Sequence, residues 1–450
     1  MEQLDLRSDF LQAATWHGTL ETAAGLLAAH PEIASGDIYT AAVLGDAAAL
    51  QRFLALEPGN ATAKGGPHGW DALTYLCFSK YLRLDRARSD GFVRAARALL
   101  DAGASANTGW YEMNHQPKPE WESALYGAAG VAHHAELTRL LLERGADPND
   151  EEVPYHAPET HDNAALQVLV ESGKLNADSL GMMLFRKTDW HDYEGIKWLL
   201  ERGVDPNRRT RWGKTALHNA VMRDNALEIF QVLLDHGADP TLLADHSDGW
   251  DRSFAGRSAL AMAARRGRGD VLDLFAQRGI PVELQGIERL FGACARNDAT
   301  AVRAIAAREP QLVRELVGEG GRLLAEFAGV GNVEGVRHLL DLGVPVAALY
   351  AGDGYFAIAQ HSTALHVAAW RARPAVVKLL IERGAPVNVQ DGKGQTPLAL
   401  AVKACVDSYW TERRSPESVR ALVDAGASAN GVPYPSGYAE VDELLRAHGK

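Results

Sequence analysis

Histidine is the residue type in this chain with the broadest chemistry, because imidazole serves as a metal ligand and as an acid or base near neutral pH. The chain has 16 histidines among 450 residues. Zinc hydrolases place two of them one helical turn apart, with a glutamate between them. No pair here has that spacing, and the three cysteines are far apart, so we expect no metal site and no cofactor. The pairs that come nearest are His133 and His134, His156 and His161, and His361 and His366.

The densest cluster of polar and aromatic residues is 187–192, in which His191 lies near Asp189 and Asp192. An imidazole between two carboxylates can act as a base. The chain lacks a G-x-S-x-G nucleophile motif, however, and Asp192 directly precedes an apolar stretch at 193–200, whose helix it would cap. We therefore expect a cap, no catalytic residues and no enzyme. A hydrolase-like enzyme that uses histidines and aspartates of the loop tips is the alternative hypothesis.

The stretch 208–214 combines several cations with an indole. Guanidinium groups bind carboxylates and phosphates through charge-assisted hydrogen bonds, and an indole stacks on a base or a guanidinium. The stretch therefore suits an acidic protein loop, a phosphate or a stacked base, and a solvated loop is the alternative. The net charge of −12 argues against general nucleic-acid binding, so a nucleic-acid partner is kept as an alternative hypothesis. The residues concerned are Arg208, Arg209, Arg211 and Trp212.

A recurring pentapeptide that begins with glycine indicates which elements position these residues. It follows an apolar pair and a short polar turn, as in Gly145-Ala-Asp-Pro-Asn149. Glycine readily adopts the left-handed conformation in which helices commonly end, because it has no Cβ. A helix end that recurs at near-regular intervals predicts one small unit stacked many times. The glycines are Gly103, Gly145, Gly203, Gly237, Gly279, Gly343, Gly384 and Gly426.

Residues 215–237 show what one unit contains. Small and apolar residues at helical spacing, among them Ala216 and Ala220, predict a first helix that a neighbour can approach closely. A polar turn at 223–225 follows, and the apolar face over 227–234 predicts a second helix. Neither helix can bury its apolar face alone, so neighbouring units must supply the core.

The helix starts share a tetrapeptide, seen as Thr215-Ala-Leu-His218, Thr363-Ala-Leu-His366 and Thr396-Pro-Leu-Ala399. These segments resemble the signature of ankyrin repeats, and the style of the chain is similar to bacterial ankyrin-repeat proteins. The resemblance implies an all-α ankyrin-repeat solenoid of stacked helix pairs with hairpin-tip insertions, in which a histidine such as His366 hydrogen-bonds between adjacent loops. It implies a single solenoid over 1–450, with about eleven pairs and a capping helix near 437–447. The expected pairs are 8–30, 37–57, 71–103, 123–145, 163–203, 215–237, 258–279, 287–309, 320–343, 363–384 and 396–426.

Long insertions separate several units, and aromatic residues recur in or beside the expected hairpin tips. Ordered long loops often carry function, and aromatic residues beside arginines are typical of interface hot spots. Packing of neighbouring loops against one another explains the aromatic residues equally well. We expect a non-catalytic scaffold that binds a protein partner through a concave surface lined by the tips. The candidate residues are Trp70, Trp110, Tyr111, Trp121, Tyr155, Arg208, Arg209, Arg211, Trp212, Trp250, Tyr355 and Phe356.

Bulk composition bears on where the chain works. It is 46% hydrophobic and 23% charged, which is typical of a globular protein. No apolar run approaches the roughly 18 residues of a membrane span, and the N-terminus lacks the pattern of a secretory signal. Cys77, Cys294 and Cys405 fit small buried residues in a reducing compartment. We therefore expect a cytoplasmic protein without membrane contact.

Overall fold

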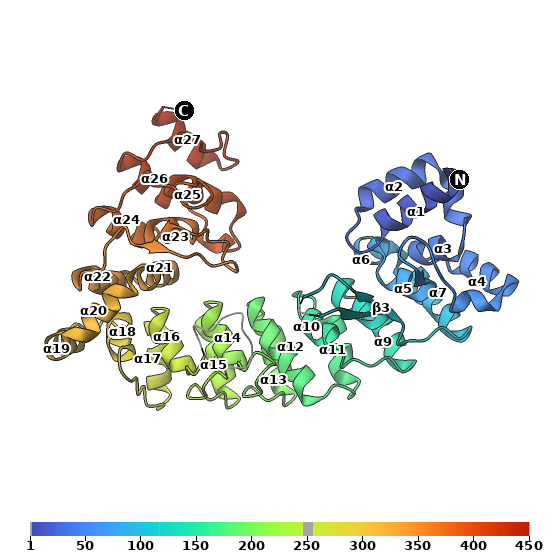
Figure 1. Cartoon of the computed structure of the whole chain (residues 1–450), viewed down its shortest axis with the longest axis horizontal. Helices are drawn as coiled ribbons and strands as arrows, with labels where there is room; N and C mark the ends of the chain where they lie inside the picture. Colours follow the sequence, from blue (N-terminus) through green and yellow to red (C-terminus); the bar gives the residue numbers. More distant parts are fainter. Residues whose placement is uncertain (1, 117, 246–254, 450) are drawn as a thin grey trace. The chain divides into compact units, whose positions relative to one another are not determined.

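Helices dominate the computed structural model, which describes residues 2–116, 118–245 and 255–449. Most of them come in pairs along the chain (Figure 1), and the strands are confined to short two-stranded hairpins, so the predicted all-α class is confirmed. The chain divides into two compact units. The first comprises Met1–Asn219 and Val232–Ala238, and the second comprises Ala220–Gln231 and Asp239–Lys450.

The first unit holds most of the helices up to α15, of which α14 and α15 contribute to both units. Two hairpins, β1–β2 and β3–β4, sit between helices of this unit. The elements are α1 Glu2–Ala14, α2 Leu20–Ala29, α3 Ile38–Leu44, α4 Ala47–Leu56, β1 Lys64–Gly65, β2 Trp70–Asp71, α5 Ala72–Cys77, α6 Lys80–Leu84, α7 Ser89–Asp101, β3 Gly109–Glu112, β4 Glu120–Ser123, α8 Ala124–Tyr126, α9 Ala135–Glu143, α10 Glu152–His156, α11 Ala164–Glu171, α12 Ala177–Asp189, α13 Tyr193–Glu201, α14 Ala216–Met222 and α15 Leu227–Asp235.

The second unit continues the helix pairs, and a short hairpin, β5–β6, precedes α23. Its last helix falls where the capping helix is expected. No helix among the described residues is long and apolar enough to cross a bilayer. The elements are α16 Ala259–Arg265, α17 Gly269–Gln277, α18 Glu288–Ala295, α19 Ala299–Arg308, α20 Pro310–Gly318, α21 Gly320–Val330, α22 Val333–Asp341, β5 Leu349–Tyr350, β6 Ser362–Thr363, α23 Ala364–Trp370, α24 Pro374–Glu382, α25 Pro397–Asp407, α26 Glu417–Asp424 and α27 Ala439–Ala447.

The predicted helix ends are confirmed by the backbone. All of the marker glycines are in the left-handed region, with φ between 75° and 101°. The asparagine that closes the pentapeptide then joins one unit to the next: Asn107 Nδ2 donates to the carbonyl of Gly145 at 2.9 Å, and its Oδ1 accepts from the Asp147 amide at 2.8 Å. Asn207 and Asn388 donate to the marker glycines that follow them, at 2.8 and 3.3 Å. Each pentapeptide therefore ends a helix, and these three also bind the next turn.

The prediction of one helix pair over 163–203 is wrong, because three helices, α11, α12 and α13, occupy that range. Helix α10, in the expected insertion, packs against α12, while α11 packs against α9. Gly173, with φ of 67°, lies at the additional helix end after α11. The segment from Gly173 to Asn176 has one residue fewer than the usual pentapeptide. Helix α10 has five residues and contains Pro154, so it carries no helical period that the sequence could display.

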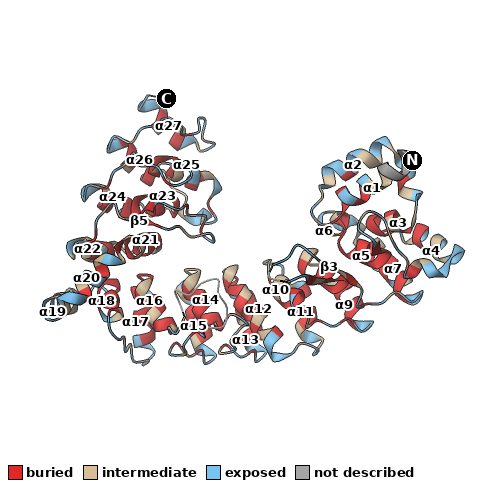
Figure 2. Ribbon diagram, viewed as in Figure 1, coloured by how far each residue is buried: buried red, intermediate tan, exposed pale blue. Residues whose placement is uncertain are grey.

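Buried residues line the sides of helices that face other helices, and exposed residues gather in the loops (Figure 2). Inner helices are rich in alanine, as in α16, where Ala259, Ala263 and Ala264 are fully buried. Outer helices contribute larger side chains, such as Leu233 of α15. Small residues let helices of successive pairs approach closely, and the leucines fill the space between them.

A buried carboxylate, Asp224, links three turns within the second unit. Its side chain is 4% exposed and lies in the turn between α14 and α15. Arg371, after α23, donates Nη2 to Asp224 at 2.8 Å, and Nε of Arg266, after α16, lies 3.4 Å from the same carboxylate. Arg266 also pairs with Glu326 of α21 at 2.8 Å. Turns that are far apart in the sequence are therefore joined by charge rather than by apolar packing.

Burial alone would raise the pKa of Asp224, but the charges of Arg266 and Arg371 outweigh burial and hold this pKa well below its usual range. Because the folded pKa lies below the unfolded one, the carboxylate stabilises the fold above pH ~4, where it is ionised in both states. That stabilisation is lost as the pH falls toward the depressed folded pKa. The ring of Phe356 lies 3.9 Å from the Arg371 guanidinium, so the network also fixes an aromatic residue of the loop before α23.

We predict that Leu233→Ala lowers the free energy of unfolding by about 2–5 kcal/mol, because it removes a fully buried leucine and leaves a cavity. Amide hydrogen exchange should rise first in α15 and in helices packed against it, since neighbours supply the core of each pair. Leu56→Ala, at an exposed position of α4, should change stability by less than about 0.5 kcal/mol. A uniform rise in exchange over all helices would contradict stacking by neighbours.

We predict that Asp224→Asn destabilises the second unit by about 3–5 kcal/mol in urea denaturation at pH 7, because it leaves the buried Arg371 without a counter-charge and leaves Arg266 with Glu326 alone. Asp273→Asn is the matched control. Asp273 pairs with Arg296 at 2.6 Å on the surface, where such pairs contribute about 0–1 kcal/mol. Equal effects of the two substitutions would show that Asp224 has no special role.

Candidate functional site

The hairpin β3–β4 places alternate side chains on opposite faces. Tyr111 pairs with Trp121 in register, and Trp110 pairs with Glu122. Tyr111 is 61% exposed, and its ring centroid lies 4.9 Å from that of the half-buried Trp121. Gly109 allows the strands to approach, because a Cβ there would lie 2.3 Å from the carbonyl oxygen of Glu122. The outer face of the hairpin therefore presents two aromatic rings toward solvent.

The inner face of the hairpin joins an aromatic cluster of the first unit. Trp110 contacts Trp70, Phe78 and Trp16, with ring centroids 4.4, 5.1 and 5.4 Å apart. Trp70 is buried and Trp110 is half-buried. These two predicted site residues therefore pack loops together, as the alternative interpretation of the aromatic residues held. Trp16 was missed by sequence reasoning, because no local pattern connects this residue with a hairpin about 90 positions later.

Buried glutamates lie beneath the same hairpin. Glu120 and Glu122 of β4 and Glu152 of α10 are all buried, with Glu122 only 4% exposed. Burial, and then the charge of Glu152, raises the pKa of Glu122 to about 8. Sequence reasoning overlooked Glu122, although strand alternation after Trp121 would have placed it on the inner face.

One imidazole, that of His156, partly offsets this negative charge. Its Nε2 lies 3.0 Å from Glu152 and its Nδ1 lies 2.9 Å from Glu159. Burial alone would lower the pKa of His156, but the hydrogen bonds to Glu152 and Glu159 outweigh burial and raise it to about 9. A cationic His156 beside two acids acts as a counter-charge, not as a free base.

A single carboxylate joins the hairpin to the basic stretch 208–214. Glu151 accepts from Lys118 of the hairpin at 3.2 Å and from Arg211 at 2.7 Å. The guanidinium of Arg211 lies 4.9 Å from the Trp212 ring, and Trp212 contacts Tyr155 with centroids 5.8 Å apart. The two predicted aromatic residues are half-buried here, so they hold the loop and leave Arg211 on its surface.

The other predicted site residues lie apart from this group. Arg208 is exposed and donates Nε to Asp178 at 2.7 Å, and Arg209 is exposed beside it. In the second unit Phe356 is buried beneath Arg371, while Tyr355 is exposed and lies 3.9 Å from the Arg223 guanidinium. Trp250 lies outside the described residues.

Asp192 and His366, which were considered for catalysis or metal binding, have structural partners. Asp192 caps α13 by accepting from the Gly195 amide at 2.9 Å, and it pairs with Lys187 at 2.7 Å, which confirms the predicted cap. His366 Nε2 lies 3.2 Å from two backbone carbonyls of the next loop, as the resemblance implied. Within the described ranges, no group of three or more His, Cys, Asp or Glu could hold a metal ion.

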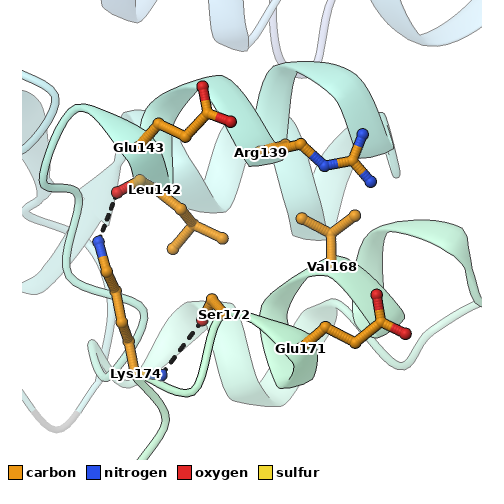
Figure 3. A pocket seen from close by; sticks show the side chains of 7 residues that line it. All are labelled: Arg139, Leu142, Glu143, Val168, Glu171, Ser172 and Lys174. Carbon is orange, nitrogen blue, oxygen red and sulfur yellow. Dashed lines mark hydrogen bonds between the residues drawn. The ribbon is translucent and has the colours of Figure 1, made fainter.

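An open pocket lies between α9 and α11 in the first unit (Figure 3). Leu142 and Val168 form its apolar wall, and Arg139, Glu143 and Glu171 line its rim. The ammonium of Lys174 donates to the Leu142 carbonyl and so caps the end of α9. The Lys174 ammonium therefore already has a partner. The pocket lies at the contact between two helices and shows no convergent polar groups that would bind a ligand.

Two segments of the chain match family models. Residues 182–286 match the model described as ankyrin repeats (3 copies), and residues 357–401 match the model described as ankyrin repeats (many copies). The first segment covers α13 to α17 entirely, and the second covers α23 and α24. Both contain the helix pairs and left-handed glycines described above.

Curated relatives and a solved structure are similar to parts of the chain. Serine/threonine-protein kinase 12 of Arabidopsis thaliana is 37% identical over 84 residues, which are 19% of this chain and 17% of the kinase. Cyclin-dependent kinase 4 inhibitor B of Bos taurus is 35% identical over 97 residues, which are 20% of this chain and 70% of the inhibitor. The human ASB11 ankyrin repeat domain is 22% identical with a TM-score of 0.25, and the match covers 61% of this chain and 98% of that domain. The chain thus spans under a fifth of the plant kinase.

These matches agree with the backbone. The tetrapeptides at Thr215 and Thr363 begin α14 and α23, and glycines with positive φ end the second helices of these pairs. The bovine inhibitor is matched over most of its length. The chain belongs to the ankyrin-repeat family.

Proposed function

We propose that this chain is a non-catalytic scaffold that binds a protein partner through the tip surface of its first unit. The tip surface is defined here as Tyr111, Met113, Trp121 and Arg211. The observation that carries the proposal is the exposure of Tyr111 and Met113, 61% and 68%, on a hairpin that the aromatic cluster and Glu151 hold in place. Because Tyr111 and Met113 are exposed, packing in the core does not explain why this ordered loop carries two large apolar side chains.

The composition of the tip surface favours a protein over a nucleic acid. Aromatic residues, methionine and arginine are enriched at protein interfaces, and burying them costs little side-chain entropy where the loop is already ordered. The cations expected to hold phosphates are already paired, Arg208 with Asp178 and Arg211 with Glu151. With a net charge of −12, the chain also lacks the long-range attraction that brings nucleic acid to a basic protein.

Two further features support a binding role. Acids and histidines that sequence reasoning considered for catalysis act as caps and counter-charges: His156 lies between Glu152 and Glu159, and Asp192 caps α13. The hydroxyl of Ser89 contacts His134 at 2.6 Å, but the other ring nitrogen of His134 caps α9, which fits a structural role. Cys77, Cys294 and Cys405 are free thiols and are buried, which fits the reducing cytoplasm as the working compartment.

We predict that Tyr111→Ala weakens partner binding about 30-fold, or about 2 kcal/mol, as expected for a hot-spot aromatic residue. The partner is first captured with the wild-type chain, and its affinity is then measured by titration calorimetry. Tyr193→Ala, the same change at an exposed position of α13, is the control and should bind as the wild type does. If both variants bind equally well, the tip surface is not the docking site. Affinity that falls steeply with salt would instead favour a nucleic-acid ligand.

We predict that the hairpin loses stability by about 2–3 kcal/mol as the pH rises from 6 to 8. The folded pKa of Glu122, about 8, lies above its unfolded value, so stability is greatest when this carboxyl is protonated and falls until the pH passes 8. Hydrogen exchange of β3 and β4 amides measures the effect. Glu122→Gln keeps the neutral shape and should remove the part of this pH dependence that Glu122 causes, leaving the part that the raised pKa of His156 contributes over the same range. An unchanged pH profile in this variant would contradict the assignment.

A further inference from the structure

Three second helices, α7, α17 and α24, begin at an arginine that makes no side-chain cap, and of these three only α24 has no acid in its first turn. Four second helices of the pairs begin instead at an Asp or Asn whose side chain accepts from the backbone amide at the third helical position, which satisfies an orphan donor and suits the helix dipole. Helix α24 begins instead at Arg373, which makes no side-chain cap, and its first turn contains no acid. The capped helices are α4 by Asp46, α13 by Asp192, α19 by Asp298 and α22 by Asn332.

A second outer helix, α17, also begins at an arginine, but there the charge is balanced. Arg268 makes two hydrogen bonds to Asp270 of the same turn, at 2.8 and 2.9 Å. Arg373 donates Nε to the carbonyl of Gly329 at 2.9 Å, and no carboxylate of the described residues lies within 4.0 Å of it. The positive end of α24 therefore carries a cation that has no counter-ion.

Two more guanidinium groups reach the same place. Arg371 and Arg413 lie over the one indole of Trp410, with 4.5 and 5.8 Å from guanidinium carbon to ring centroid. Gly329 connects Arg371 to Arg373, because Arg373 donates to its carbonyl and Arg371 Nη1 lies 3.4 Å from the position of a Cβ on it. The three cations therefore converge beside the first turn of α24.

This cluster has hydrogen-bond donors without acceptors. Arg371 is 2% exposed, yet its Nε has no partner among the described residues, and the same is true of the buried Nη1 of Arg413. Asp224 serves Arg371 and Arg266 together, and Arg413 pairs only with the exposed Glu412 at 3.4 Å. Burial, and then the charges of Arg413 and Arg371, lowers the pKa of Arg373 to about 9. The site thus holds more positive charge than its carboxylates balance.

We propose that Arg371, Arg373 and Arg413, with the first turn of α24, form a binding site for a phosphate group. Guanidinium groups recognise phosphate through paired, charge-assisted hydrogen bonds, and uncapped helix N-termini attract anions. A dianion supplies charge for the two arginines that lack a buried partner, Arg373 and Arg413. These residues belong to the second unit, so the proposal is independent of the tip surface of the first.

The test uses Arg373→Asp in the full chain. The new carboxylate caps α24 and takes the place of the anion, so the unfolding midpoint in chloride should rise by about 2–4 °C. The wild type should gain a saturable stabilisation when roughly 20 mM inorganic phosphate replaces chloride at equal ionic strength, and the variant should lose it. A structural role for Arg373 predicts the opposite, a lower midpoint in chloride and an unchanged response to phosphate, and that result would overturn the proposal.

Arg383→Asp is the matched control. Arg383 ends the same helix, pairs with Asp341 at 2.8 Å and gives the same change in net charge. This variant should keep the phosphate response of the wild type, and loss of the response in it would show that net charge alone is responsible. O-phosphoserine, titrated in parallel, distinguishes the source of the phosphate: tighter binding than inorganic phosphate indicates a phosphorylated side chain, and equal binding indicates free phosphate. If neither compound stabilises the wild-type chain, the site does not exist.

Discussion

The second unit depends on one buried negative charge. Asp224 is the shared counter-ion of Arg266 and Arg371, which come from the turns after α16 and after α23. Moving charged groups out of water costs free energy. Their mutual attraction offsets that cost only when both guanidinium groups lie close to the carboxylate. The arrangement therefore permits little variation in how these turns meet. It also leaves the positive charge at Arg373 and Arg413 unbalanced, because Asp224 is already shared.

In the first unit, aromatic and charged residues hold an exposed hairpin in place. Its hairpin β3–β4 projects from the helix pairs, and an exposed loop of that length would ordinarily lose entropy when it binds. Trp110 and Glu151 remove most of that freedom before any partner arrives, the first through aromatic contacts and the second through two ion pairs. What is left exposed, Tyr111 and Met113, can then be buried at low cost. Rigid presentation of a few large side chains is the condition under which hot spots form.

The sequence could predict whatever repeats locally. The marker glycines and the tetrapeptides placed most helices correctly, because each rests on a conformational preference of a few adjacent residues. The pairing failed at 163–203, where α10 is too short to show a period. The sequence could not predict the ion pair between Asp224 and Arg371, because these residues are 147 positions apart and neither turn has an unusual composition. The candidate aromatic residues include buried ones such as Trp70 and exposed ones such as Tyr111, and burial depends on neighbours that no local pattern specifies.

Repetition within one chain offers a comparison that single domains lack. A comparable structural position occurs at the start of each outer helix, so the residues that occupy it can be compared between copies. Asp192 and Asp298 cap their helices there, whereas Arg373 makes no side-chain cap and donates to the Gly329 carbonyl of α21. Its neighbours add further positive charge where an acid would be the stabilising choice. A residue that costs stability at a position where the chain elsewhere uses a better one is best explained by a ligand that supplies the missing charge.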